Sequence, residues 1–237
     1  MSEQQSIGEE VKNWRAPTRP ESAVMQGRYC RVEPLDADAH AALLFQAVEG
    51  QDALFRYMYD GPFASAAQYH RWVRESTAKS DMQFFAIKDV ETGRFGGVAS
   101  YLRIAPEAGS IEVGNICFGL RLQNTRAATE TMYLMMKWAF EAGYRRYEWK
   151  CNALNIASRR AAQRLGFTYE GVFRQAAVAK GRNRDTAWFA VIDKEWPALS
   201  EAFDFWLAPS NFDAQGRQKE RLSDLTRLVR AGSDPAL

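Results

Sequence analysis

The segment 110–152 carries the pattern that most restricts the fold, a strand followed by a helix and a second strand. The run SIEVGNICFGL at 110–120 alternates like a strand, so its odd-numbered residues should share one face and its even-numbered residues the other. Residues 126–142 place apolar side chains at helical spacing, and RRYEWKCN at 145–152 is the second strand. This order predicts two neighbouring parallel strands joined by a right-handed crossover.

Shorter elements surround this unit. In chain order they are strand 27–35, helices 36–50 and 65–78, strands 82–89 and 95–104, helix 155–167, and two strands paired as a hairpin around the turn GRNR. The turns between the three strands from 82 to 120 are short, so these strands should form an antiparallel meander. We therefore expect an α/β (α+β) fold with a mixed, mostly antiparallel central sheet and flanking helices.

The chain divides into an N-terminal tail at 1–27, a domain at 28–196 and a C-terminal helical extension at 197–237. Helices are expected in the extension at 198–207 and 217–230, and their apolar stripe either covers this domain or contacts a partner chain. No apolar run approaches the roughly 20 residues that cross a bilayer. The first residues also lack the apolar core of a secretory signal. We therefore expect a cytoplasmic protein without a membrane partner.

Charge and the scarcity of histidine argue against several function classes. The 31 basic and 29 acidic residues nearly cancel, so the charge balance does not favour a nucleic-acid partner. Neither His40 nor His70 lies near a cysteine in sequence, and Cys30, Cys117 and Cys151 form no CxxC pair. A zinc site is therefore not expected, and a histidine-based triad has few residues to draw on. We expect no metal.

The start of helix 126–142 is a candidate anion site. The first backbone N–H groups of a helix have no partner within the helix, and its dipole places partial positive charge there. Arg121 and Arg126 add full charges on either side of the turn, whereas Glu130 in the first turns weakens the case slightly. The turn before the helix therefore suits a phosphate group.

Two motifs in this order resemble the GNAT superfamily of N-acetyltransferases. They are QNTRAA at 123–128 and NIASRRAAQRLGF at 155–167. The second motif, together with YEGVFR at 169–174, is similar to the RimJ/RimL branch, whose members acetylate protein α-amino groups. The resemblance covers roughly 28–196.

The resemblance implies a GNAT-type sheet whose parallel pair, 110–120 and 145–152, splays apart around acetyl-CoA. The backbone that would receive the cofactor comprises Ile116, Cys117 and Phe118 on the strand, and Gln123, Asn124, Thr125, Arg126, Ala127, Ala128 and Thr129 at the pyrophosphate turn. Arg126 stands where the family has its first glycine. Its guanidinium either pairs with phosphate oxygens or points outward as a solvated charge, and we expect the former.

The resemblance also suggests residues for the chemistry. Asn155 would bond the pantetheine arm while capping its helix. Ser158 matches a serine that in this branch lies near the CoA sulfur and can protonate the leaving thiolate. Many other relatives use a tyrosine four residues later, but this chain has Ala162 there, so Ser158 is the candidate acid. Glu112 is the candidate base, since a carboxylate in an apolar strand has a raised pKa; an ion-paired or solvent-facing glutamate is the alternative.

The predicted function is acetyl-CoA-dependent N-acetylation of a primary amine by direct transfer in a ternary complex. The acceptor would be a protein N-terminus or a small amine, and the protein a monomer or homodimer. The alternative is a catalytically idle acyl-CoA-binding or regulatory module, which the unusual Arg126 and Ala162 would also fit.

Overall fold

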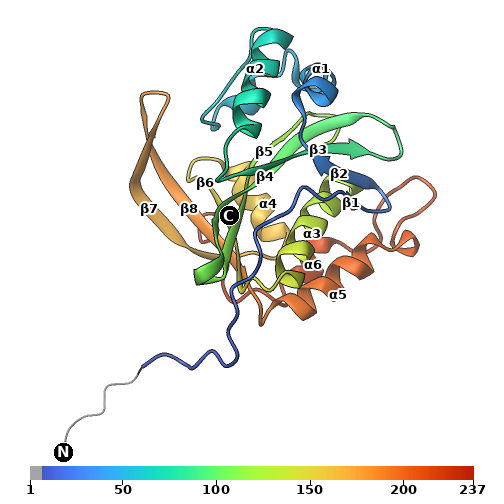
Figure 1. The fold of residues 1–237 in the computed structure, drawn as a ribbon. Helices are drawn as coiled ribbons and strands as arrows, with labels where there is room; N and C mark the ends of the chain where they lie inside the picture. Colours follow the sequence, from blue (N-terminus) through green and yellow to red (C-terminus); the bar gives the residue numbers. More distant parts are fainter. Residues whose placement is uncertain (1–6) are drawn as a thin grey trace, which may run out of the picture.

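An eight-stranded sheet forms the centre of the computed structural model, which describes residues 7–237 (Figure 1). The strands are β1 (Met25–Gln26), β2 (Cys30–Pro34), β3 (Gln83–Asp89), β4 (Phe95–Ala105), β5 (Ser110–Phe118), β6 (Arg146–Asn152), β7 (Thr168–Ala179) and β8 (Arg182–Ile192). Their order across the sheet is β1-β2-β3-β4-β5-β6-β8-β7. Only β5 and β6 pair in parallel within the described chain, so the mixed, mostly antiparallel sheet with flanking helices is confirmed.

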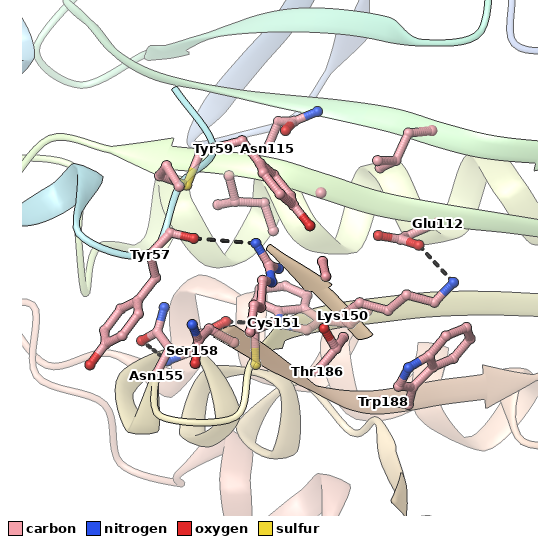
Figure 2. A pocket seen from close by; sticks show the side chains of 18 of the residues that line it. Tyr57, Tyr59, Glu112, Asn115, Lys150, Cys151, Asn155, Ser158, Thr186 and Trp188 are labelled. Carbon is pink, nitrogen blue, oxygen red and sulfur yellow. Dashed lines mark hydrogen bonds and ion pairs between the residues drawn. The ribbon is translucent and has the colours of Figure 1, made fainter. Parts of the chain in front are cut away.

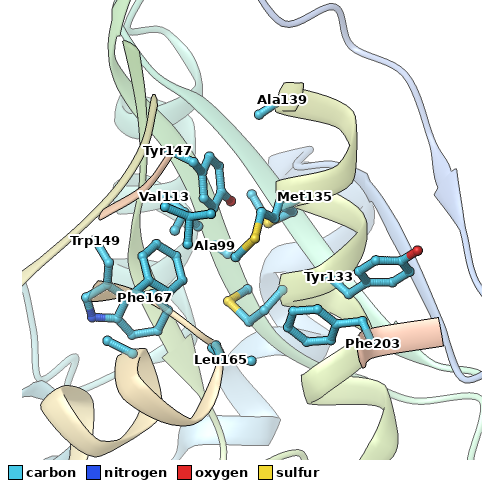
Figure 3. Packing of buried hydrophobic residues seen from close by; sticks show 14 of the residues in the cluster. Ala99, Val113, Tyr133, Met135, Ala139, Tyr147, Trp149, Leu165, Phe167 and Phe203 are labelled. Atoms are coloured by element: carbon cyan, nitrogen blue, oxygen red, sulfur yellow. The ribbon is translucent and has the colours of Figure 1, made fainter. Parts of the chain in front are cut away.

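Helices cover both faces of the sheet (Figure 1). They are α1 (Ala37–Val48), α2 (Ala66–Thr77), α3 (Arg126–Glu141), α4 (Ile156–Arg164), α5 (Trp196–Leu207) and α6 (Leu222–Thr226). The methionine-rich stripe of α3 packs against the central strands, and Figure 3 shows Met135 facing Val113 and Tyr147. A second apolar cluster lies on the opposite face, between that face and α1 with α2. The face of β6 and β8 opposite α3 carries polar and charged side chains.

A bulge interrupts β5 and changes which side chains share a face. Asn115 has a φ of 50°, and the pairing register of β4 with β5 shifts between Val98 and Ser100. Ile111 and Val113 therefore pack against α3, whereas Cys117 packs in the α1 and α2 cluster. The expectation that Cys117 shares a face with Ile111 and Val113 is wrong, because the extra residue inverts the alternation.

The C-terminal residues belong to the same hydrophobic core as the sheet. Leu199, Phe203 and Leu222 are fully buried in the cluster that contains α3. The predicted helix 217–230 is wrong in length, since only α6 forms. The N–H groups of Lys219 and Glu220 instead donate to the backbone carbonyl and the side-chain oxygen of Asn211, so the chain before Leu222 is not helical.

Two further details differ from or extend the expectations. The turn of the last hairpin is Lys180–Gly181, because Arg182 already pairs with Ala179. The predicted tail contributes Met25 and Gln26, which pair with β2 at the sheet edge.

No helix within residues 7–237 has the length and apolar character needed to span a bilayer.

Candidate active site

The parallel strands β5 and β6 separate partway along their length. Their pairing runs from Ser110 with Arg146 to Val113 with Trp149 and then ends. A cavity of about 320 Å³ lies where the strands diverge, lined by residues 112–116 and 149–152 (Figure 2). The start of α4, the segment 57–59 and the β7–β8 hairpin complete its wall. The bulge in β5 lies at this point. Because the extra residue of a bulge bends its strand, the bulge helps to turn β5 away from β6.

Glu112 lines the cavity as a buried, ion-paired carboxylate. Its side chain is 3% exposed, and Nζ of Lys150 lies 2.9 Å from Oε2. The Arg103 guanidinium donates from one nitrogen to both oxygens at 2.8 Å. Lys150 also contacts Glu148 at 2.7 Å and lies over the Trp188 ring. The site is therefore a network of alternating charges on the face of β5 and β6 opposite α3.

Burial raises the pKa of Glu112 above its ordinary value of 4.5. The positive charges of Arg103 and Lys150 act in the opposite direction but do not cancel the loss of hydration. The carboxylate accepts three hydrogen bonds and so keeps acceptor capacity for a further donor. A proton acceptor with a raised pKa is suited to general-base chemistry near neutrality.

Ser158 and Asn155 lie at the other end of the cavity in Figure 2. Asn155 caps α4, since its side-chain oxygen accepts from the backbone N–H of Ser158 at 3.1 Å. The Ser158 hydroxyl accepts from the indole nitrogen of Trp149 at 3.0 Å. Accepting this bond polarises the hydroxyl and leaves its proton available for donation into the cavity.

The turn before α3 leaves backbone donors unused. Thr125 caps the helix by accepting from the N–H of Ala128, and Gln123 donates its side-chain amide to the carbonyl of Phe118. The N–H groups of Asn124, Arg126 and Ala127 have no partner in the described chain. Asn124 has a φ of 61°, in the left-handed region, so the chain turns sharply before the helix. Such an arrangement suits an anion.

Gly119 allows the turn to pack closely. A Cβ at this position would lie 2.2 Å from the carbonyl oxygen of Ala47, so no larger residue fits.

Glu130, the acid near this helix start, is engaged elsewhere. Its carboxylate accepts hydrogen bonds from the backbone of Arg28, Tyr29 and Cys30 at 2.6–2.9 Å. It therefore orders the β1–β2 turn, which accounts for an acid in this position.

Arg126 directs its guanidinium toward aromatic side chains. The group lies over the rings of Tyr29 and Phe212, 4.6 Å and 5.0 Å from their centroids. One nitrogen lies 3.2 Å from a carboxylate oxygen of the exposed Glu91. The guanidinium is thus held beside the helix start and is neither freely solvated nor buried.

The structure brings only some of the expected site residues to one cavity. Glu112, Ile116, Asn155 and Ser158 line it. Residues 123–129 lie at the helix start instead, and Cys117 and Phe118 connect the two places along β5. Thr129 is buried, and its hydroxyl accepts from Arg164 at 3.1 Å. Across residues 7–237, no cluster of His, Cys, Asp or Glu could hold a metal ion.

Several functional candidates were not anticipated from the sequence. Lys150, Arg103, Arg184 and Trp188 all line the cavity. The alternation of Arg146, Glu148 and Lys150 in β6 could have revealed a charged face, because alternate residues of a strand point the same way. The position of β8 beside β6 carries Arg184 and Trp188 to the site, and this depends on the sheet order.

Comparisons with known proteins show which family the chain resembles. A GCN5-related N-acetyltransferase from Brucella melitensis is 44% identical, covers 92% of this chain and 100% of its own, and superposes with a TM-score of 0.89. A probable GNAT-family acetyltransferase from Chromobacterium violaceum is 36% identical, with 82% and 98% covered and a TM-score of 0.78. No curated protein sequence matches the chain.

A more distant structure shares the fold. It is a RimL ribosomal L7/L12 alpha-N-protein acetyltransferase in complex with coenzyme A, 23% identical over 72% of this chain and 99% of its own, with a TM-score of 0.61. The family model for the acetyltransferase (GNAT) domain matches residues 31–168. The chain therefore belongs to the GNAT family of acetyltransferases.

Proposed function

We propose that the protein transfers the acetyl group of acetyl-CoA directly to a primary amine while both are bound. The observation that carries the proposal is that Glu112 and Ser158 line one cavity at the splay of β5 and β6. A proton acceptor and a proton donor at two ends of a cavity are what amine acetylation requires, since the amine loses a proton and the leaving thiolate gains one.

The cofactor would lie along β5 toward the start of α3. The unused N–H groups of Asn124, Arg126 and Ala127 would receive its pyrophosphate, with the Arg126 charge beside them. Asn155 would bond the pantetheine arm. Beyond Val113 the edge of β5 that faces β6 has no strand partner, so backbone N–H groups near Ile116, Cys117 and Phe118 would polarise the acetyl carbonyl.

Glu112 would take the proton from the acceptor amine, directly or through one water. Its raised pKa supports this role, and its acceptor capacity beyond Arg103 and Lys150 gives the amine or water a place to bond. These two cations also fix the carboxylate in one orientation, so little reorganisation is needed during the reaction.

Ser158 would return a proton to the thiolate of CoA. The Trp149 indole holds the hydroxyl oxygen, so its O–H vector is free to turn toward the cavity. The spacing of Asn155 and Ser158, three residues apart, resembles the RimJ/RimL branch, and this resemblance supports an α-amino acceptor. An α-amino group is accordingly within the proposed acceptor class.

Two measurements test the proposal. Calorimetry should show acetyl-CoA binding, and a thiol-release assay should show turnover with members of a primary-amine panel. Glu112→Gln should lower kcat about 100-fold or more and leave the Kd for acetyl-CoA nearly unchanged, because a general base contributes roughly 10²–10⁴. Glu148→Gln is the matched control, since this carboxylate contacts the same Lys150 but does not line the cavity.

The control should lose much less activity than Glu112→Gln. An unchanged rate in Glu112→Gln would remove this residue as the base. Binding of acetyl-CoA without turnover of any amine would contradict the proposed transfer.

A further inference from the structure

Two side chains of β8 that line the cavity carry unsatisfied donors. Nε of Arg184 and Nε1 of Trp188 are buried and have no hydrogen-bond partner in the described chain. Both residues line the cavity, and they are four positions apart on one face of the strand. A buried donor without an acceptor is costly, and the chain itself leaves the polar groups of this wall incompletely satisfied.

The guanidinium group of Arg184 makes two weak contacts with the segment 57–59. One guanidinium nitrogen lies 3.4 Å from the carbonyl oxygen of Tyr57, which is a long hydrogen bond. The guanidinium also lies over the ring of Tyr59, 4.6 Å from its centroid. Neither contact neutralises the charge.

The other charges of the cavity are paired with one another. Arg103 and Lys150 both contact Glu112, and Lys150 also contacts Glu148. Arg184 forms no ion pair with a carboxylate in the described chain. Its neighbour Asp185 is engaged with the backbone of Gln175 and the side chain of Asn183. Arg184 is therefore the lining cation whose charge is not matched by an acid.

The anion that matches Arg184 does not come from the reactive end of acetyl-CoA. The thioester and pantetheine arm carry no charge, and the phosphates belong at the unused N–H groups before α3. An anion in the cavity at β8 would thus be part of the acceptor. A guanidinium is suited to it, because its planar donors fit carboxylate or phosphate oxygens.

The cavity also favours a small acceptor. Its volume of about 320 Å³ lies at the lower end of ligand pockets. The β7–β8 hairpin is tied to the segment that forms the opposite wall, since Nζ of Lys180 donates to the carbonyls of Phe55 and Asp60 at 2.8 Å and 3.3 Å. This bridge limits the space between the hairpin and the segment 55–60.

We propose that the acceptor is a small primary amine that also carries an anionic group, a carboxylate or a phosphate, which binds Arg184. The amine then faces Glu112 on β5 while the anion lies against β8. This inference rests on the proposed acetyl transfer and names the substrate class of the same site.

Matched pairs of amines test the inference. Glycine with glycinamide and β-alanine with its amide compare a carboxylate with a neutral amide, and phosphoethanolamine with ethanolamine tests a phosphate. The wild-type protein should favour the anionic member about 10- to 100-fold in kcat/KM, the range expected of a charge-assisted hydrogen bond. Arg184→Gln should abolish this preference, because the KM for the anionic amines should rise while the KM for the neutral amines and for acetyl-CoA stays unchanged.

The control is Arg182→Gln, because Arg182 lies on the same strand but is exposed and does not line the cavity. It should keep the wild-type preference. No preference for anionic amines in the wild type, or a rise in the KM for acetyl-CoA in place of the acceptor KM in Arg184→Gln, would overturn the inference.

Direct binding separates this inference from the proposed catalysis. Trp188 lines the cavity, so its fluorescence should report the titration of each compound into the CoA-bound protein. Selective binding of the anionic compounds that is lost in Arg184→Gln, without turnover, would support the anion site and contradict acetyl transfer to these amines. Binding without selectivity, or no binding of any member, would overturn the anion site.

Discussion

Glu112 on β5 and Lys150 on β6 form a buried ion pair next to the point where their strands separate. The two charged atoms lie 2.9 Å apart, and the side chains are 3% and 7% exposed. The backbones no longer pair beyond Val113 and Trp149, so this side-chain contact spans the strands at the mouth of the splay. The pair thus links the stability of the sheet to the charge state of the proposed base.

Lys150→Met should lower the free energy of unfolding by about 3–5 kcal/mol, the range for removing one partner of a buried ion pair. The change leaves Glu112 and Glu148 buried with one cation fewer. Lys137→Met is the control, because Lys137 and Glu141 form an exposed pair at 3.8 Å whose loss costs about 0–1 kcal/mol. Urea unfolding of both variants checks this, and equal losses would contradict it.

Activity should rise with pH through the pKa of Glu112. The proposed base acts when deprotonated, and burial raises its pKa above the ordinary 4.5. As the pH is lowered, activity should therefore be lost at a higher pH than an exposed glutamate would give. Lys150→Met removes a cation that lowers this pKa. The acidic limb of the kcat/KM profile should therefore move to higher pH in this variant, and a shift to lower pH would exclude Glu112 as the titrating group.

Ser158→Ala should lower both stability and turnover. The stability depends on the hydroxyl oxygen as an acceptor, whereas turnover depends on the hydroxyl proton. It removes the acceptor of the Trp149 indole N–H, which costs about 1–3 kcal/mol of unfolding free energy when a donor is left buried. It should also lower kcat about 100-fold if the hydroxyl protonates the thiolate.

Trp149→Phe in the Ser158→Ala background removes the orphaned donor and separates the two effects. The second substitution should then cost less stability than Trp149→Phe costs alone, as a double-mutant cycle of unfolding free energies would show. The kcat should not recover. Recovery of activity with stability would mean that Ser158 acts only by positioning Trp149.

The sequence predicted the architecture because its strongest signals are local. The helix 126–142 and the strands around it have clear periodicity, and the structure places α3 at Arg126–Glu141. The strand alternation failed after Asn115, since no residue pattern announces a bulge that depends on pairing with β4. The helix expected at 217–230 is shorter in the structure because Lys219 and Glu220 donate to Asn211, a contact that depends on the preceding fold.

The candidate site was predictable only where it follows a motif. Asn155 and Ser158 belong to a contiguous stretch, and the structure places both on the cavity. Arg103 and Lys150 reach Glu112 from two different strands, so their contacts depend on tertiary register. Arg184 is brought beside β6 by a hairpin that inserts β8 into the sheet, which local sequence does not encode.

Arg126→Met tests whether the guanidinium contributes to cofactor binding. Its charge lies beside the start of α3, where a full charge is worth about 0.3–1 kcal/mol, so the Kd for CoA should rise about two- to fivefold. Glu91→Gln removes the acid near the guanidinium and should change the Kd in the opposite direction. Calorimetry at low and high salt measures both, and an unchanged Kd in Arg126→Met at low salt would contradict the expectation.

Asp234 near the C-terminus should support the cofactor end of the site. It forms a buried ion pair with Arg159, which follows Ser158 in α4 and also donates to the carbonyl of Ala153 at 2.8 Å. Asp234→Ala leaves that guanidinium buried without its acid and should lower the free energy of unfolding by about 3–5 kcal/mol. The start of α4 should loosen, so the KM for acetyl-CoA should rise more than kcat falls.

The control for Asp234→Ala is Glu9→Ala. Glu9 forms an exposed pair with Lys194 at 3.2 Å, so its loss should cost about 0–1 kcal/mol. Thermal unfolding with and without CoA, together with steady-state kinetics, measures both variants. If Asp234→Ala loses stability but keeps the wild-type KM for acetyl-CoA, then the ion pair fastens the C-terminus without ordering Asn155 and Ser158.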